Sequence, residues 1–171
     1  MACSPLLLRG IITPQDHLIV LFPDPPMSPV SLEPLQVTAA VLRRRGRFFL
    51  ARRAPGKNLA GFWEFPGGKI ESCESPQTCL MREMAEEFGI RVKVQDHLIT
   101  TTYHYPERAV TLLAFATRHL RGRFVPTSHD CIGWFTRAEI GALKLAPADV
   151  PIAQAVGVPL PEDSSAITRS M

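Results

Sequence analysis

Apolar and polar positions along the 171-residue chain follow two different periods, and the change of period separates strands from helices. Runs rich in β-branched and aromatic residues and bounded by turn signals predict strands over 36–42, 48–53, 62–65, 92–105, 109–117 and 132–135. Arg45-Gly46 and the stretch from Pro106 to Arg108 supply turns between consecutive strands. The middle of the chain should therefore form a sheet.

One longer segment, 76–88, has the helical period instead. Ser75 is a favourable N-cap, Pro76 suits the first helical position, and Gly89 supplies the left-handed residue that often ends a helix. Within this helix, one arc is apolar and should face a core; it holds Leu80, Met84 and Phe88. Two shorter helices are expected over 136–143 and 147–156.

The neighbouring arc of the same helix is acidic. Glu83, Glu86 and Glu87 stand at positions i, i+3 and i+4, where like charges repel by a few tenths of a kcal/mol per pair. A folded chain keeps such carboxylates together if the face is solvated or if a cation neutralises it. Their hard oxygen atoms suit Mg²⁺ or Mn²⁺. From the three residues alone, a solvated helix face and a metal site both stay open.

Composition divides the chain into three parts. Residues 1–35 contain seven prolines and only short apolar islands, such as Leu18 to Phe22, which predicts a loosely held N-terminal arm. Residues 36–156 have the length and apolar content of one domain, and 157–171 should be a flexible tail. Met27 opens the tract that leads into the domain and is an alternative start of the protein.

We expect a chain that starts at Met27 to keep the melting temperature and activity of the full chain, because residues 1–26 should contribute neither core nor site. Thermal unfolding and a rate assay on both chains check this. A loss of many degrees would show instead that Leu18 to Phe22 docks on the domain.

Charge and cysteine content narrow the possible partners. The net charge of +3 is too small for a nucleic-acid groove, and no apolar run reaches the length of a membrane span. A solvated hairpin turn explains the basic cluster of Arg43, Arg44, Arg45 and Arg47. The four cysteines lack zinc spacing, which indicates free thiols in a reducing compartment and a cytoplasmic protein. Its oligomeric state does not follow from these features.

From Gly68 onward the chain matches a known motif at every fixed position. Five residues separate Gly68 from Glu74, and seven more precede the segment from Arg82 to Ile90, REMAEEFGI. This pattern resembles the Nudix box, and the resemblance extends over about 36–156. It is most similar to the MutT-type branch in Arg52-Arg53, WEFPGGK at 63–69, YPE at 105–107 and LAPADVP at 145–151. The resemblance implies an α/β/α sandwich with a mixed sheet and a catalytic helix at about 76–88.

The resemblance also implies roles for individual residues. Divalent ions would be held by Glu83, Glu86, Glu87 and the carbonyl oxygen of Gly67, with Glu83 the nearest candidate for the base that activates water. Arg53 would reach the phosphates, whereas Arg52 should point to the opposite side of its strand. Glu74 and Arg82 face away from the acidic arc on a helical wheel, and an ion pair that orients the helix is the role expected for them.

Many MutT-like enzymes carry a further glutamate six residues before the last-strand tryptophan. Counting back from Trp134 gives Ser128, so this carboxylate is missing, and His129 or Asp130 could substitute for it. The base of the nucleotide should lie near Phe65, Tyr105 and Asp149.

Asp149 leaves the choice of base open. Enzymes specific for 8-oxo-dGTP carry asparagine at this position, whereas similar enzymes acting on CTP and dCTP carry aspartate. A carboxylate only accepts hydrogen bonds, which suits either the N1–H and N2–H edge of guanine or the amine of cytosine.

The resulting hypothesis is a Mg²⁺-dependent nucleoside triphosphate pyrophosphohydrolase of the nucleotide pool, with 8-oxo-dGTP as leading substrate and CTP or dCTP as the alternative. A nucleotide-sensing module without catalysis and a Nudix enzyme for another diphosphate are the rival interpretations. No nucleic-acid polymer or membrane is expected as a partner.

Overall fold

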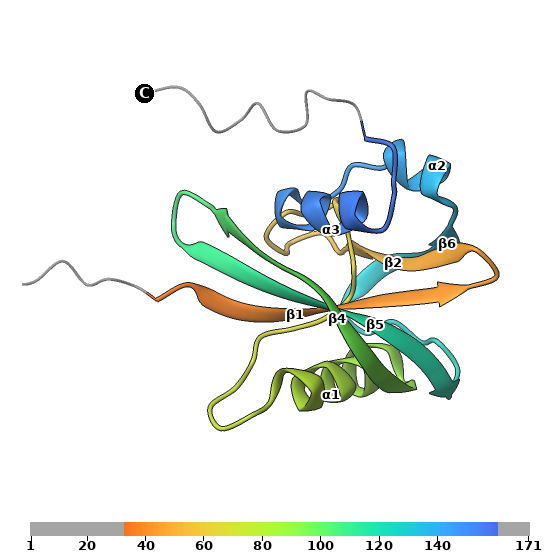
Figure 1. Ribbon diagram of the computed structural model, residues 1–171, viewed down its shortest axis with the longest axis horizontal. Helices are drawn as coiled ribbons and strands as arrows, with labels where there is room; N and C mark the ends of the chain where they lie inside the picture. Colours follow the sequence, from red (N-terminus) through yellow and green to blue (C-terminus); the bar gives the residue numbers. More distant parts are fainter. Residues whose placement is uncertain (1–32, 161–171) are drawn as a thin grey trace, which may run out of the picture. The chain divides into compact units, whose positions relative to one another are not determined.

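A computed structural model describes residues 33–160 (Figure 1). The expected N-terminal arm up to residue 32, with its 18–22 island, and residues 161–171 lie outside the described residues. In chain order the elements are β1 (Leu35–Arg44), β2 (Arg47–Arg53), β3 (Trp63–Glu64), α1 (Pro76–Phe88), β4 (Arg91–His104), β5 (Ala109–Arg121), β6 (His129–Phe135), α2 (Arg137–Gly141), the 3-10 turn η1 (Pro147–Asp149) and α3 (Val150–Ala155).

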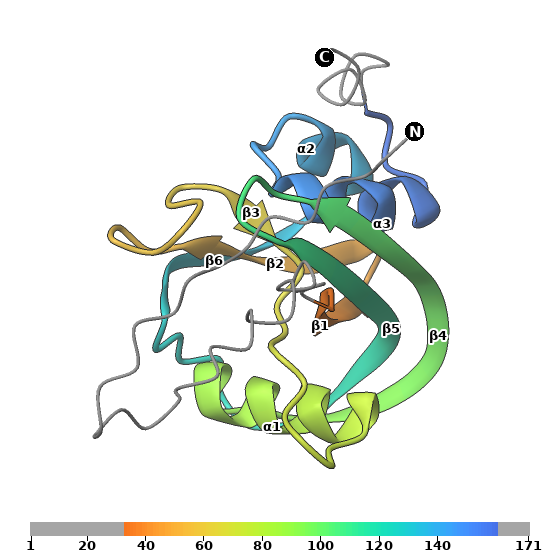
Figure 2. The ribbon, with the colours of Figure 1, turned by 90° about the vertical axis from the view of Figure 1, so that its left-hand side faces the viewer.

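The strands form a mixed sheet in the order β3-β2-β1-β5-β4, and β6 pairs with β2. β1 and β5 run parallel, while the other strand pairs are antiparallel. α1 covers one side of this sheet and α2 and α3 cover the other (Figures 1 and 2). The expected α/β/α sandwich is therefore confirmed.

Alternation along β1 explains why the sheet has a core on each face. Ala39 and Val41 belong to the apolar cluster that includes Ile152 of α3, while Ala40 and Leu42 belong to the cluster that includes Phe88 of α1. Because successive strand residues point to opposite faces, one continuous apolar run supplies both layers.

α1 begins and ends where the sequence predicts. The Ser75 hydroxyl accepts a hydrogen bond from the backbone N–H of Thr78 at 3.1 Å, and Gly89 adopts a φ of 68° after the last turn. The predicted apolar arc is buried, and Cys79 joins it.

The loop before α1 lies along the edge of β1. The backbone N–H of Ala40 donates to the Pro66 carbonyl at 2.7 Å, and that of Thr38 donates to the Gly68 carbonyl at 2.8 Å. A Cβ atom on Gly67 would lie 1.9 Å from the Thr38 carbonyl oxygen, so only glycine allows this approach. The loop is thereby fixed beside the sheet, where it leads into the acidic helix.

Other boundaries differ from the sequence expectation in detail. β5 is four residues longer than expected, and β6 starts at His129, three residues early. Pro147 opens η1 and not the final helix directly. Val158, two residues beyond the expected domain boundary at 156, is buried in the core.

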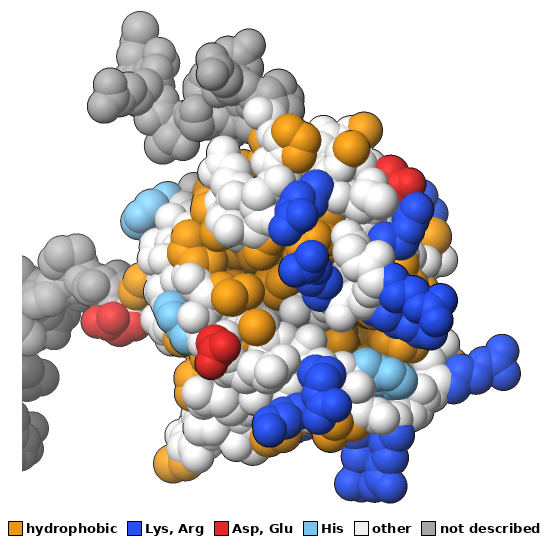
Figure 3. Space-filling view, turned by 45° about the vertical axis from the view of Figure 1, so that its right-hand side comes forward, with side chains coloured by type: hydrophobic (Ala, Val, Ile, Leu, Met, Phe, Trp, Pro, Cys, Tyr) orange, Lys and Arg blue, Asp and Glu red, His pale blue; other side chains and the backbone are white. Residues whose placement is uncertain are grey.

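The exposure of the hairpin arginines and the state of three cysteines agree with the expectations from the sequence. The four arginines of the β1–β2 hairpin are exposed, as a solvated turn requires, and Figure 3 shows Lys and Arg side chains spread over one face of the molecule. Cys73, Cys79 and Cys131 are free thiols. Within residues 33–160, no helix is both long and apolar enough to cross a membrane.

Candidate active site

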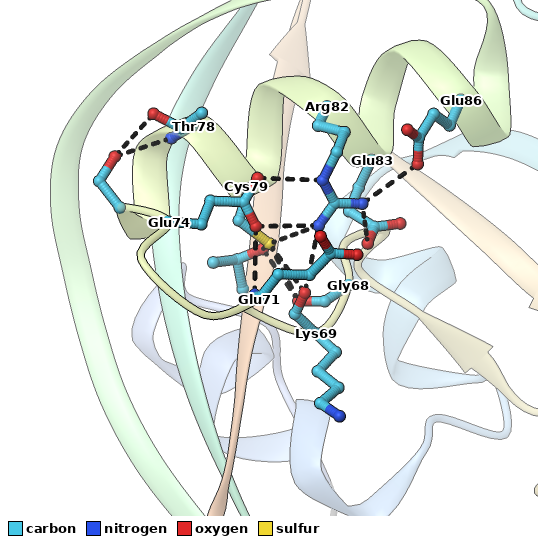
Figure 4. A network of polar contacts seen from close by, with 11 residues as sticks. Gly68, Lys69, Glu71, Glu74, Thr78, Cys79, Arg82, Glu83 and Glu86 are labelled. Atoms are coloured by element: carbon cyan, nitrogen blue, oxygen red, sulfur yellow. Dashed lines mark hydrogen bonds and ion pairs between the residues drawn. The ribbon is translucent and has the colours of Figure 1, made fainter.

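A network of ion pairs centred on Arg82 organises the acidic face of α1 (Figure 4). Its guanidinium binds both carboxylate oxygens of Glu74, with Nε–Oε1 and Nη2–Oε2 distances of 3.0 Å. The predicted ion pair is therefore present, and the hydrogen bond from Arg82 holds the pKa of Glu74 below its usual range. The pair ties the loop before the helix to the helix itself.

The expectation that Arg82 faces away from the acidic arc is wrong. Its Nη1 also donates to Glu83 at 2.8 Å and to Glu86 at 3.1 Å. A helical wheel places Cα atoms, but the long arginine side chain reaches across to residues one and four positions further on. Arg82 therefore offsets part of the repulsion among the glutamates.

Glu83 lies directly against the glycine loop. A Cβ atom on Gly68 would be 2.0 Å from the Glu83 carboxyl carbon, so the absence of a side chain there makes room for this carboxylate. Burial raises the pKa of Glu83 despite the adjacent Arg82. A carboxylate that is partly withdrawn from water can accept a proton more readily than an exposed one.

Glu87 faces a small cavity beside the same loop. It accepts a hydrogen bond of 2.6 Å from the Ser128 hydroxyl. The cavity has a volume of about 100 Å³. It is lined by Arg53, Lys57, Glu64, Gly67, Glu87, Ser128 and His129.

The donor set at this cavity fits a hard cation. Gly67 lines the cavity, and its carbonyl oxygen accepts no hydrogen bond from the described residues. Carboxylate and carbonyl oxygens are the ligands that Mg²⁺ prefers. Their present arrangement is not a closed ligand shell: within residues 33–160, no three His, Cys, Asp or Glu side chains converge on one point, since Glu83 and Glu86 turn to Arg82 and Glu87 to Ser128.

Arg53 lies at the border of this cavity. Its Nη1 donates to Glu64 Oε2 at 2.7 Å. Arg52, the preceding residue, points to the other side of the strand and pairs with Asp130 at 2.9 Å, as the alternation predicts. Because Asp130 is held there, only His129 of the two expected substitutes for the missing carboxylate lines the cavity.

A larger cleft of about 250 Å³ adjoins the small cavity, and Arg53 and Glu64 line both. Its wall includes Tyr105, Asp149 and several apolar side chains, among them Val37, Val110 and Leu112. Phe65 is not among the lining residues; its side chain is buried in the core with 3% exposure. Phe65 contributes its backbone, because its N–H donates to Asp149 Oδ1 at 2.8 Å.

Hydrogen bonds between β3 and the segment that precedes η1 bring Asp149 to the cleft. The Trp63 N–H donates to the Lys144 carbonyl and the Ala146 N–H donates to the Trp63 carbonyl, both at 2.8 Å. Asp149 is only 5% exposed, and burial followed by repulsion from Glu64 raises its pKa well above the usual value. Among the described residues, its Oδ2 has no hydrogen-bond partner and is left for the cleft.

We expect Asp149→Asn to stabilise the protein at pH 8 and to have little effect near pH 4. Because the folded state binds the Asp149 proton more tightly than the unfolded state, stability is highest below the unfolded carboxyl pKa and falls as the pH rises towards the folded pKa. An amide has no proton to lose, so the variant should gain a few degrees at pH 8, about 1 kcal/mol. Calorimetric melting from pH 4 to 8 measures this, and a gain that grows towards acid would contradict it.

Sequence reasoning missed Glu64 as a site residue. It stands within the WEFPGGK stretch and contacts both Arg53 and His129, with a His129 Nε2–Glu64 Oε1 distance of 2.8 Å. The alternation along β3 gives its side chain a direction, but its partners come from β2 and β6, which are distant in sequence. Lys57 was also missed, and a loop position offers no periodic signal.

An acidic helix, a glycine loop and a cationic side chain at the mouth of a cleft are the features expected of an enzyme that hydrolyses phosphorylated ligands. Comparisons with known proteins agree. A family model described as "NUDIX domain" matches residues 37–155. The chain belongs to the Nudix family, whose hydrolases act on nucleoside diphosphate derivatives and generally use a divalent metal such as Mg²⁺.

Two relatives of this chain have names that give different substrates. The CTP pyrophosphohydrolase of Escherichia coli (strain K12) is 34% identical over 121 residues, which cover 71% of this chain and 90% of that protein. An 8-oxo-dGTP diphosphatase from Proteus vulgaris is 35% identical over 98 residues, covering 57% and 88%. The solution structure of the E. coli ORF135 protein aligns with a TM-score of 0.65 at 30% identity, covering 82% of this chain and 97% of that one.

Proposed function

We propose that this protein hydrolyses nucleoside triphosphates to a nucleoside monophosphate and pyrophosphate, with 8-oxo-dGTP as the leading substrate. The observation that carries the proposal is the continuity of the two cavities: Arg53 and Glu64 border both the small acidic cavity and the larger cleft. A nucleotide can therefore extend from a phosphate-binding end to a base-binding end. In the cytoplasm, such an enzyme would remove damaged nucleotides before they enter DNA.

At the phosphate end, Glu83, Glu86, Glu87 and the Gly67 carbonyl would hold Mg²⁺ or Mn²⁺. When bound, the metal would offset the negative charge of the phosphate oxygens. Arg53 would bind a phosphate oxygen and orient the chain of phosphates. Glu83, whose pKa burial raises, would take the proton from the attacking water at its carboxylate.

CTP or dCTP is the second candidate, and the carboxylate of Asp149 is compatible with it. An ionised Asp149 would present an acceptor to the exocyclic amine of cytosine. The similarity to a CTP pyrophosphohydrolase along 90% of that protein supports the same alternative.

Pyrophosphate release from a panel of nucleotides tests the proposal. We expect the highest kcat/KM with 8-oxo-dGTP, or with CTP and dCTP under the alternative, and a requirement for Mg²⁺ or Mn²⁺. Nucleotide binding without cleavage would indicate a sensing module. Cleavage confined to a sugar nucleotide or a dinucleotide would place the protein in another group of Nudix enzymes.

A further inference from the structure

His129 lines the small cavity and contacts Glu64, which borders both cavities. Its side chain is 5% exposed, and its ring stacks on Phe88 of α1 with a centroid distance of 5.1 Å. Both ring nitrogens have partners: Nε2 lies 2.8 Å from Glu64 Oε1, and Nδ1 lies 3.2 Å from the Ser128 hydroxyl oxygen. The ring is therefore held in one orientation.

The Ser128 hydroxyl has a single proton, and its direction fixes that of the other hydrogen bonds. The distance of 2.6 Å to Glu87 Oε1 is that of a hydroxyl donating to a carboxylate. Ser128 must then accept at its oxygen, so His129 Nδ1 carries a proton and donates it. Nε2 faces the Glu64 carboxylate, which only accepts, so Nε2 must donate as well. The ring protonated at both nitrogens then joins Glu64 through Ser128 to Glu87 in one continuous path of hydrogen bonds.

We propose that His129 is a positioning residue that acts through Ser128 to hold the Glu87 carboxylate towards the small cavity. This inference rests on the proposed function, in which Glu87 takes part in catalysis. Without the path, the Glu87 side chain would be free to rotate on a helix face that it shares with Glu83 and Glu86, from which like charge repels it.

Glu64 anchors the other end of the path. Its Oε2 accepts from Arg53 Nη1 at 2.7 Å, while its Oε1 faces His129. Four consecutive polar contacts therefore join Arg53, which would bind phosphate, to the Glu87 carboxylate on α1. This arrangement fixes Glu87 relative to Arg53 although they belong to different layers of the fold.

Matched substitutions separate positioning from simple packing. His129→Gln can still reach Glu64 but has no donor at the place of the histidine Nδ1. His129→Asn keeps a donor near that place and loses the contact to Glu64. Ser128→Ala removes the hydroxyl, and Ser128→Thr keeps it. Asp130→Asn is the control, since Asp130 pairs with Arg52 outside the cavity.

We expect Ser128→Ala and His129→Gln each to lower kcat about tenfold or more while KM changes less than about twofold, because a lost charge-assisted hydrogen bond has effects of this size. Ser128→Thr should keep kcat within about threefold of the unsubstituted protein, and the control should match it. His129→Asn should lose less than His129→Gln, because it keeps the donor to Ser128 although it loses the contact to Glu64. Because both residues act on Glu87 through one path, the double variant Ser128→Ala/His129→Gln should lose no more than the worse single variant. The inference would be overturned if the loss of kcat in the double variant equalled the product of the two single losses. Equal losses in His129→Gln and His129→Asn would also overturn it.

A spectroscopic measurement tests the same path without substrate or metal. Nitrogen-15 NMR of the histidine side chains in the full-length protein should show a proton on His129 Nδ1, and Ser128→Ala should change that signal. An unprotonated Nδ1 in the unsubstituted protein would contradict the assigned direction of the path. Because this readout does not depend on turnover, failure of the proposed function would leave it intact and the two failures can be told apart.

Discussion

Replacing either Glu86 or Glu87 with glutamine is expected to lower kcat at least a hundredfold at saturating Mg²⁺ while leaving the fold intact. Glutamine keeps the size of the side chain but removes its negative charge, and a neutral amide is a poor ligand for a hard cation. For Glu87, the amide oxygen can still accept the hydrogen bond from Ser128. The expected loss is therefore one of charge and not of packing.

The measurement is a steady-state rate over a range of Mg²⁺ concentrations, together with thermal unfolding. Glu71→Gln is a matched control, because this exposed glutamate precedes α1 and lines neither cavity. The control should retain full activity. Unchanged turnover in Glu86→Gln or Glu87→Gln would remove that residue from the expected ligand set.

The second large effect is expected at Asp149, in the choice between the nucleobases 8-oxoguanine and cytosine. Since the Phe65 N–H donates to Asp149 Oδ1, an asparagine at 149 would place its oxygen there and turn its NH₂ group towards the cleft. A donor in that place suits the carbonyl oxygen of 8-oxoguanine and opposes the amine of cytosine. We expect Asp149→Asn to retain or improve 8-oxo-dGTP hydrolysis and to weaken CTP and dCTP hydrolysis.

Asp149→Ala removes both carboxylate oxygens. The transition state of the preferred nucleotide should then lose about 1–3 kcal/mol of stabilisation, which is roughly ten- to a hundredfold in kcat/KM. Rates for 8-oxo-dGTP, dGTP, CTP and dCTP in both variants give the answer. A uniform reduction for all four nucleotides would assign Asp149 a structural role, through its hydrogen bond to the Phe65 backbone, and none in base selection.

Local signals in the sequence predicted the parts of this fold that local forces decide. The cap at Ser75 and the left-handed Gly89 are properties of single residues, so both ends of α1 were predictable. The apolar run within 36–42, which contains β-branched residues, likewise predicted a strand. The path of the loop from Pro66 to Ile70 was not predictable, because its hydrogen bonds go to a strand about thirty residues away.

At the site, too, local features were predictable from the sequence and contacts between distant residues were not. The three glutamates of α1 follow from helical spacing, but Arg82 was misplaced because side-chain reach is not part of a helical wheel. Glu64 and His129 meet only after β3 and β6 both pair with β2, a contact between positions 65 residues apart. Phe65 was expected at the base, yet the sheet directs its ring into the core.

Analysis of the products formed from 8-oxo-dGTP, CTP and dCTP in ¹⁸O-labelled water tests the central claim most directly. We expect a nucleoside monophosphate and pyrophosphate in equal amounts from the preferred nucleotide, with one labelled oxygen per turnover. Glu87→Gln should form at most about one hundredth of that product over the same time. Formation of a nucleoside diphosphate and phosphate, or the absence of cleavage with bound nucleotide, would contradict it.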